Sequence, residues 1–210
     1  MRKSAWIVLG LCALGSACTA KAKEAAPASL TAPQPAKKTS KPLKSVEELS
    51  AMKDDEAKSL AAFAELRKVL THPRCINCHP ASERPNQGEE SHPHQPLVVR
   101  GAGGMGATGM RCLGCHGQES ALGVPGNPAW HLAPPEMAWE GLNASELCAQ
   151  LLDPERNGGK SKDDIVKHIA TDELVSYGWA PPEHLEPAPG DQKLAGEIAR
   201  IWVDAGAHCP

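Results

Sequence analysis

The sequence has few aromatic side chains and no long hydrophobic run. Aromatic residues make up 3% of its 210 residues, with a single phenylalanine, Phe63, and a single tyrosine, Tyr177. With 19 glycines and 19 prolines as well, little material is left for a conventional protein core. The main apolar stretch, residues 5–14, is well short of the ~20 residues that cross a membrane, which argues against a spanning helix.

The sequence also lacks an excess of positive charge. It has 22 Lys and Arg against 25 Asp and Glu, a formal net charge of −3. The basic residues are unevenly placed, because residues 18–45 hold six lysines and one glutamate. The rest of the chain is therefore acidic, which argues against nucleic-acid binding and favours docking to basic partner proteins.

The N-terminus has the pattern of an export signal. Arg2 and Lys3 precede the short apolar stretch, which predicts a secretory signal peptide over residues 1–17. Residues 14–18 resemble a bacterial lipoprotein box, although Leu14 lies one position further from the cysteine than usual. On this interpretation Cys18 carries a lipid anchor, and the alternative is cleavage without lipid. In both cases we expect a periplasmic protein, held at the membrane as a lipoprotein in the first.

One five-residue pattern, Cys-x-x-Cys-His, occurs twice. The two copies are Cys75-Ile-Asn-Cys78-His79 and Cys112-Leu-Gly-Cys115-His116. Two thiols about one helical turn apart can bond to the two vinyl groups on one edge of a porphyrin, and the following histidine then reaches the iron. This is the attachment signature of haem c. We therefore predict two covalently bound haem c groups, whose apolar faces would add to the thin core.

The rest of the chain predicts an all-α, loop-rich fold of the cytochrome c type, with small helices around two covalent haems. Residues 18–44, rich in Ala, Pro and Lys, predict a disordered tether, and residues 45–210 the di-haem domain. No alternating strand pattern stands out.

Capping patterns and apolar periodicity predict the helices. Ser45 and Glu48 form a capping-box pattern before a helix expected over 46–70. A second helix is expected over 145–152. Two more helices should begin at the caps Ser161 and Asp191. Gly206 should end the final helix.

Two cysteines outside the motifs, Cys148 and Cys209, remain in the exported chain. An even pair in an oxidising compartment predicts a disulfide that pins the C-terminal tail to the helix at 145–152. The alternative is two buried free thiols.

For the motif cysteines the alternatives are a four-cysteine zinc site and a thioredoxin-like pair. Export and the histidine after each second cysteine favour haem.

The second protein ligand of each iron is less clearly marked. His94 and Met137 are the main candidates, because prolines stiffen the chain around both and a ligand gains from a fixed orientation. The further candidates are His131, Met110 and His168. An iron without a second protein ligand is the remaining alternative.

Several runs resemble a family of small bacterial di-haem cytochromes. They are His72–Pro80, Gly109–Cys112, Trp130–Pro134, Met137–Gly141, Asp153–Gly159, Tyr177–Trp179 and Ala205–Pro210. Members are often labelled as a subunit accompanying isoquinoline 1-oxidoreductase, a molybdenum hydroxylase. The resemblance covers about residues 70–210 and implies an accessory electron carrier with a redox partner of that kind, although no molybdenum-site residue is visible.

Three functions follow from these patterns. The main hypothesis is a periplasmic di-haem cytochrome that is not an enzyme and passes electrons between a dehydrogenase partner and a respiratory acceptor. The second is a di-haem peroxidase or oxidase, which needs one open iron position. The third is a haem-free, zinc-binding interaction module.

Overall fold

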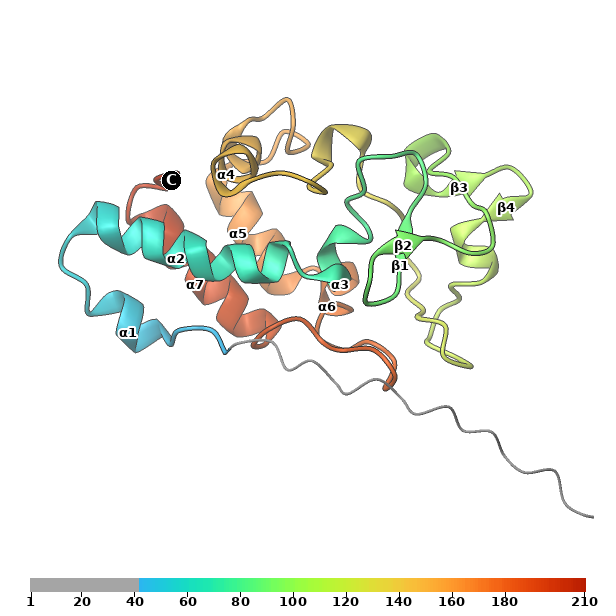
Figure 1. The fold of residues 1–210 in the computed structure, drawn as a ribbon, viewed down its shortest axis with the longest axis horizontal. Helices are drawn as coiled ribbons and strands as arrows, with labels where there is room; N and C mark the ends of the chain where they lie inside the picture. Colours follow the sequence, from blue (N-terminus) through green and yellow to red (C-terminus); the bar gives the residue numbers. More distant parts are fainter. Residues whose placement is uncertain (1–41) are drawn as a thin grey trace, which may run out of the picture. The chain divides into compact units, whose positions relative to one another are not determined.

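The computed structural model describes residues 42–210, which are mostly helical with long connecting loops (Figure 1). The predicted signal peptide at 1–17, the lipid anchor at Cys18 and the tether up to residue 41 lie outside the described residues. Leu43 packs against the hydrophobic core, and the Lys44 amide donates to Glu65 Oε2 at 3.2 Å. The folded part therefore already includes these two residues of the predicted tether.

The helix expected over 46–70 is in fact two helices. α1 (Val46–Ser50) begins at the predicted capping box, where the Ser45 hydroxyl accepts from the Glu48 amide at 3.2 Å. α2 (Asp55–Leu70) begins afresh after Asp54, whose carboxylate accepts from the Ala57 amide at 2.7 Å. The single-helix prediction was wrong because Asp54 satisfies a free helix N-terminal amide, which favours a new start at that point.

Five further α-helices complete the helical part of the described chain. They are α3 (Pro73–Ile76), α4 (Ala144–Leu152), α5 (Lys162–Thr171), α6 (Glu173–Ser176) and α7 (Gln192–Asp204). The predicted caps are confirmed, because Ser161 and Asp191 accept from amides in the first turns of α5 and α7. Gly206 follows α7 with φ +109°, a conformation that favours glycine and ends the helix as predicted. No helix among residues 42–210 is long and apolar enough to span a bilayer.

The loops between the helices contain short strands and 3-10 turns. β1 (Asn86–Gln87) pairs with β2 (His92–Pro93), and β3 (Gly106–Ala107) with β4 (Met110–Arg111), both antiparallel. The 3-10 turns are η1 (Ala102–Gly104), η2 (Cys112–Gly114) and η3 (Pro135–Met137). The predicted helical, loop-rich character is confirmed, but the strands were not foreseen. Strands of two residues are too short to leave an alternating pattern.

The helices bury an apolar core of their own. Its main members are Phe63 and Leu66 of α2, Leu147 of α4, Ile165 of α5, and Ile198 and Trp202 of α7. Phe63 and Trp202 lie at its centre, with ring centroids 5.4 Å apart. Cysteine pairing follows the prediction, because Cys148 and Cys209 form a disulfide that fixes the C-terminal tail to α4. The first motif adjoins this core, because Cys75 and Ile76 pack against it.

Candidate functional site

Both motifs fold into single helical turns. The first begins in α3, where Pro73 occupies an N-terminal helical position and His72 caps the turn through its Nδ1 atom, and Cys78 and His79 follow in the next turn. The second coincides with η2, where the His116 amide donates to the Cys112 carbonyl at 2.9 Å. In each, the two thiols are separated by about one turn, as attachment to one porphyrin edge requires.

The first motif histidine has a fixed tautomer and a fixed ring plane. His79 Nδ1 lies 2.7 Å from the backbone carbonyl oxygen of Met137. A carbonyl can only accept, so Nδ1 carries the proton and Nε2 keeps a free lone pair. The ring stacks on Trp139, with centroids 3.5 Å apart and planes 5° from parallel. Burial lowers the pKa of His79 to about 4, against the opposing effect of the Met137 carbonyl, so the ring is neutral at pH 7.

The second motif histidine repeats this arrangement with different residues. His116 Nδ1 lies 2.7 Å from the Pro125 carbonyl oxygen, which again leaves Nε2 with the lone pair. Its ring stacks on Trp130 at a centroid distance of 4.3 Å and an angle of 6°. Burial also lowers the pKa of His116, with a smaller contribution in the same direction from the charge of His94. Each motif thus presents a neutral imidazole nitrogen on a braced ring.

All four motif thiols are free, and burial opposes ionisation of three of them. Burial raises the pKa of Cys75 to about 12 and that of Cys78 to about 11. Burial raises the pKa of Cys112 as well. A thioredoxin-like pair needs a thiol whose pKa is lowered, so these environments do not fit that alternative. Among residues 42–210, no three His, Cys, Asp or Glu side chains gather to hold a metal ion directly, so the four thiols do not form a zinc-binding cluster.

A cavity adjoins the first motif, and its lining includes Cys75, Cys78 and His79. Its other walls come from three helices, from the loop after α6, and from the segment at 131–139, which includes Met137. They include Val69 and Leu70 of α2, His168 and Ile169 of α5, Val175 of α6, and Tyr177. The lining is largely apolar, which suits a porphyrin face, and it borders the helical core.

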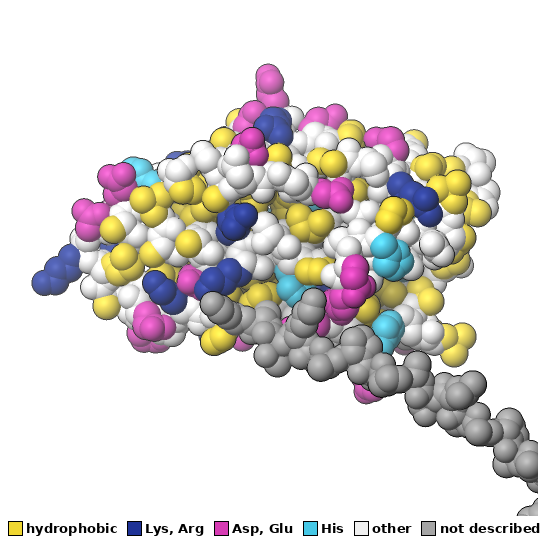
Figure 2. Space-filling view, viewed as in Figure 1, with side chains coloured by type: hydrophobic (Ala, Val, Ile, Leu, Met, Phe, Trp, Pro, Cys, Tyr) yellow, Lys and Arg dark blue, Asp and Glu magenta, His cyan; other side chains and the backbone are white. Residues whose placement is uncertain are grey.

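The second motif lies at a more exposed end of the molecule. Cys115 is exposed, and Cys112 and His116 are half-buried. All the large apolar side chains that are exposed in residues 42–210 belong to the segment around this motif. They are Leu97, Val99, Met110, Leu113, Leu122 and Val124. Figure 2 shows apolar side chains gathered over this end, at the right of the view. Such a surface needs a cover in water, and a porphyrin held by Cys112 and Cys115 would provide one.

The segment at 129–134 connects the two motifs. The Ala133 amide donates to the Cys78 carbonyl at 3.1 Å, while Trp130 stacks on His116. The edge of Tyr177, a residue of the first cavity, meets Trp130 at a centroid distance of 5.0 Å. The two sites are therefore neighbours in the folded chain.

The predicted second ligands occupy different places. The rings of His94 and His116 lie 6.0 Å apart between centroids and 60° from parallel. Two imidazoles on opposite sides of one metal, with bonds of about 2 Å, have ring centres roughly 6 Å apart, so this pair fits a haem iron. His94 Nδ1 lies 3.1 Å from the Pro96 carbonyl oxygen, which leaves its Nε2 with the lone pair.

The other four candidates lie as follows. Met137 places its backbone carbonyl against Nδ1 of His79, so its main chain supports the ring from behind. Met110 is exposed on β4. His131 is exposed at the edge of the first cavity, with Nδ1 held by the Ala129 carbonyl at 2.6 Å, and His168 lines the same cavity from α5. The supporting carbonyls and both tryptophan stacks were not predicted from the sequence.

No protein-family model, curated protein or solved structure matches the chain. The resemblance to di-haem cytochromes therefore stays a prediction.

Proposed function

We propose that the protein is a periplasmic di-haem c-type cytochrome that carries electrons. The observation that carries the proposal is the shared geometry of the two motif histidines. Each has Nδ1 hydrogen-bonded to a backbone carbonyl, a ring stacked on tryptophan and a free Nε2. Histidines that bind metals commonly donate the other ring N–H to such a partner, which fixes the tautomer and the ring plane.

The cysteines and apolar surfaces support the same interpretation. Cys75 and Cys78 would hold one haem in the first cavity, and Cys112 and Cys115 the other against the exposed apolar side chains. His79 and His116 would bind the irons, with His94 as the second ligand opposite His116. Bound haem supplies a one-electron Fe(III)/Fe(II) couple.

Electron carriage also fits the closeness of the two sites. Each transfer moves one electron, so the donor site is oxidised as its neighbour is reduced, and the protein returns to its starting state once an outside acceptor takes the electron. Redox partner proteins would supply and remove it, and the family resemblance points to a molybdenum hydroxylase as one of them. The acidic composition favours basic partners rather than nucleic acid, and a lipid at Cys18 would hold the carrier at the membrane.

Haem attachment can be tested directly. The full chain is produced by export together with a haem-maturation system, then examined by intact mass and by haem stain on a denaturing gel. We expect two haems in the wild type and one in each of the pairs Cys75→Ser/Cys78→Ser and Cys112→Ser/Cys115→Ser. The matched control, Cys148→Ser/Cys209→Ser, removes the other two mature cysteines of the described part and should keep both haems.

Two outcomes would contradict the proposal. Unstained wild-type protein that binds zinc in proportion to its motif cysteines would point to the zinc module. Two haems with rapid peroxide turnover at one of them would point to the di-haem enzyme. The expected carrier shows two reversible one-electron steps in a redox titration and no such turnover.

A further inference from the structure

We propose that His168, held by Asp172, is the second protein ligand of the iron at the first motif. The inference rests on the proposed function, because it needs a haem on Cys75 and Cys78. It assigns the role to a residue of α5 in place of Met137.

His168 lies on α5, a well-fixed helix that borders the cavity at the first motif. α5 packs its apolar side, including Ile165 and Ile169, into the core, so its backbone is well fixed. From its last turn, His168 reaches the cavity that Cys75, Cys78 and His79 also line. His79 and His168 thus line one cavity from different elements.

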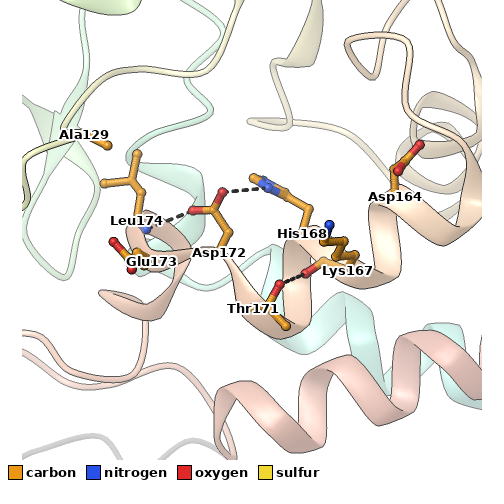
Figure 3. A pocket seen from close by; sticks show the side chains of 8 residues that line it. All are labelled: Ala129, Asp164, Lys167, His168, Thr171, Asp172, Glu173 and Leu174. Atoms are coloured by element: carbon orange, nitrogen blue, oxygen red, sulfur yellow. Dashed lines mark hydrogen bonds and ion pairs between the residues drawn. The ribbon is translucent and has the colours of Figure 1, made fainter.

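Asp172 fixes the His168 ring from one side. Its Oδ2 atom lies 3.2 Å from His168 Nδ1, while Oδ1 accepts from the Leu174 amide at 2.9 Å (Figure 3). Oδ1 also accepts from the Val175 amide at 3.1 Å. The Asp172 backbone is also held, because its carbonyl accepts from Gln192 Nε2 at 3.0 Å. A carboxylate so anchored keeps the proton of His168 on Nδ1.

The other ring nitrogen is then available. Among residues 42–210, no hydrogen bond uses Nε2 of His168. A carboxylate on Nδ1 and a metal on Nε2 is a recurring arrangement, in which the carboxylate orients the ring and increases its donor strength. Asp172 would therefore be a positioning residue, and His168 the ligand.

The rival candidates fit less well. The Met137 carbonyl lies against Nδ1 of His79, so its main chain belongs to the support of the first ligand. The second ligand has to approach the iron from the far side of the porphyrin. His131 lines the cavity too, but its ring is exposed and its Nδ1 is held by the carbonyl of Ala129, two residues away, rather than by an anchored carboxylate.

The first experiment compares His168→Ala with the controls His131→Gln and Met137→Leu, all as full-length haem-loaded protein. EPR of the oxidised form and carbon monoxide titration of the reduced form are recorded after mass spectrometry has confirmed two haems. We expect His168→Ala to lose one of two low-spin signals and to bind one more CO per protein than the wild type. Met137→Leu keeps the main-chain carbonyl that supports His79, and His131→Gln replaces an exposed ring, so these variants of the rival candidates should keep two low-spin signals and the wild-type CO stoichiometry.

The inference is overturned if His168→Ala keeps both low-spin signals, or if Met137→Leu or His131→Gln opens the site instead. A wild-type protein without a haem on the first motif would contradict the proposed function instead. The haem count distinguishes that outcome from a failure of the His168 assignment. If His168→Ala fails to fold, His168→Met retains a long ligating side chain. It should replace a His/His by a His/Met near-infrared signature and raise one midpoint potential, and unchanged spectra would overturn the assignment.

Asp172→Asn tests the positioning role. Asparagine still caps α6 but loses the negative charge, so the fold should be kept. We expect two haems, no added CO binding and a positive shift of one midpoint potential, because the imidazole becomes a weaker donor to Fe(III). A folded Asp172→Asn protein with both midpoint potentials unchanged would refute this role.

Discussion

The imidazole of His79 lies flat against the indole of Trp139, with ring centroids 3.5 Å apart and planes 5° from parallel. His116 lies in the same way on Trp130. A chain with so few aromatic residues thus places one tryptophan behind each motif histidine. Each stack fixes the plane of the imidazole and so limits the directions in which Nε2 can point toward an iron.

Replacing Trp139 tests what the stack does. Trp139→Ala removes a buried indole, so the free energy of unfolding should fall by about 3 kcal/mol in urea titrations. The first haem should be retained covalently but show a broadened EPR signal, because the His79 plane is no longer fixed. Trp139→Phe keeps an aromatic face and should leave the signal sharp. Equal broadening in both variants would show that the stacked face is not what orients the ring.

Gly104 lies where a side chain has no room. A Cβ atom there would come 2.2 Å from the Leu132 carbonyl oxygen, and the backbone has φ +74°. Gly104→Ala should therefore lower the free energy of unfolding by more than about 2 kcal/mol, through strain plus clash, and reduce loading of the second haem. Gly109→Ala is the matched control, since φ is +86° but no atom lies within 4 Å. It should cost about 1 kcal/mol, and equal costs would rule out the close approach as the cause.

In the haem-free protein, where no iron holds the ring, acid should lower the free energy of unfolding through His79. Burial lowers its folded-state pKa to about 4, while the unfolded chain has a pKa near the ordinary ~6.5. Between these values the unfolded state binds a proton that the folded state does not. The stability due to the neutral ring is therefore complete above about pH 6.5 and is lost as the pH falls toward 4.

The variant His79→Gln isolates this effect. Urea unfolding at pH 7 and pH 5 should show a larger loss of stability in the wild type than in the variant. Both proteins are measured without haem, and the difference between the two pH values is compared rather than the absolute stabilities. An identical pH dependence in both proteins would place the titrating group elsewhere.

The Cys148–Cys209 disulfide spans 61 positions of sequence. In the chain-entropy account, its loss should lower the free energy of unfolding by about 4 kcal/mol. Cys148→Ala/Cys209→Ala measures this by urea unfolding, while reduction of the wild type provides an independent comparison. Haem content should not change, because neither cysteine lines the first cavity or belongs to a motif. A loss below about 1 kcal/mol would mean that Trp202 and Ser59, which bond to His208, hold the tail alone.

Local features were predicted well from the sequence. Ser45, Ser161 and Asp191 begin helices because capping depends on a side chain and amides three residues away. The break before Asp54 could have been found by the same reasoning, since two acidic residues follow that cap. Each of these features depends on neighbours in sequence.

The supports of the candidate site could not be predicted in this way. Backbone carbonyls carry no sequence signature, so the roles of Met137 and Pro125 depend on how distant loops meet. The approach of His94 to His116 likewise follows from the β1–β2 hairpin, whose two-residue strands are too short to leave a sequence pattern. His168 could have been ranked higher, because Asp172 four residues later lies on the same side of the helix.

The two supporting carbonyls differ greatly in their distance along the chain. His116 is supported from nine residues away and His79 from 58 residues away. Closing a short loop has a lower entropic cost and is faster than closing a long one. We therefore expect the motif that comes second in the sequence to reach its haem-ready shape first during maturation, while the first motif waits until the chain beyond Met137 has emerged and folded.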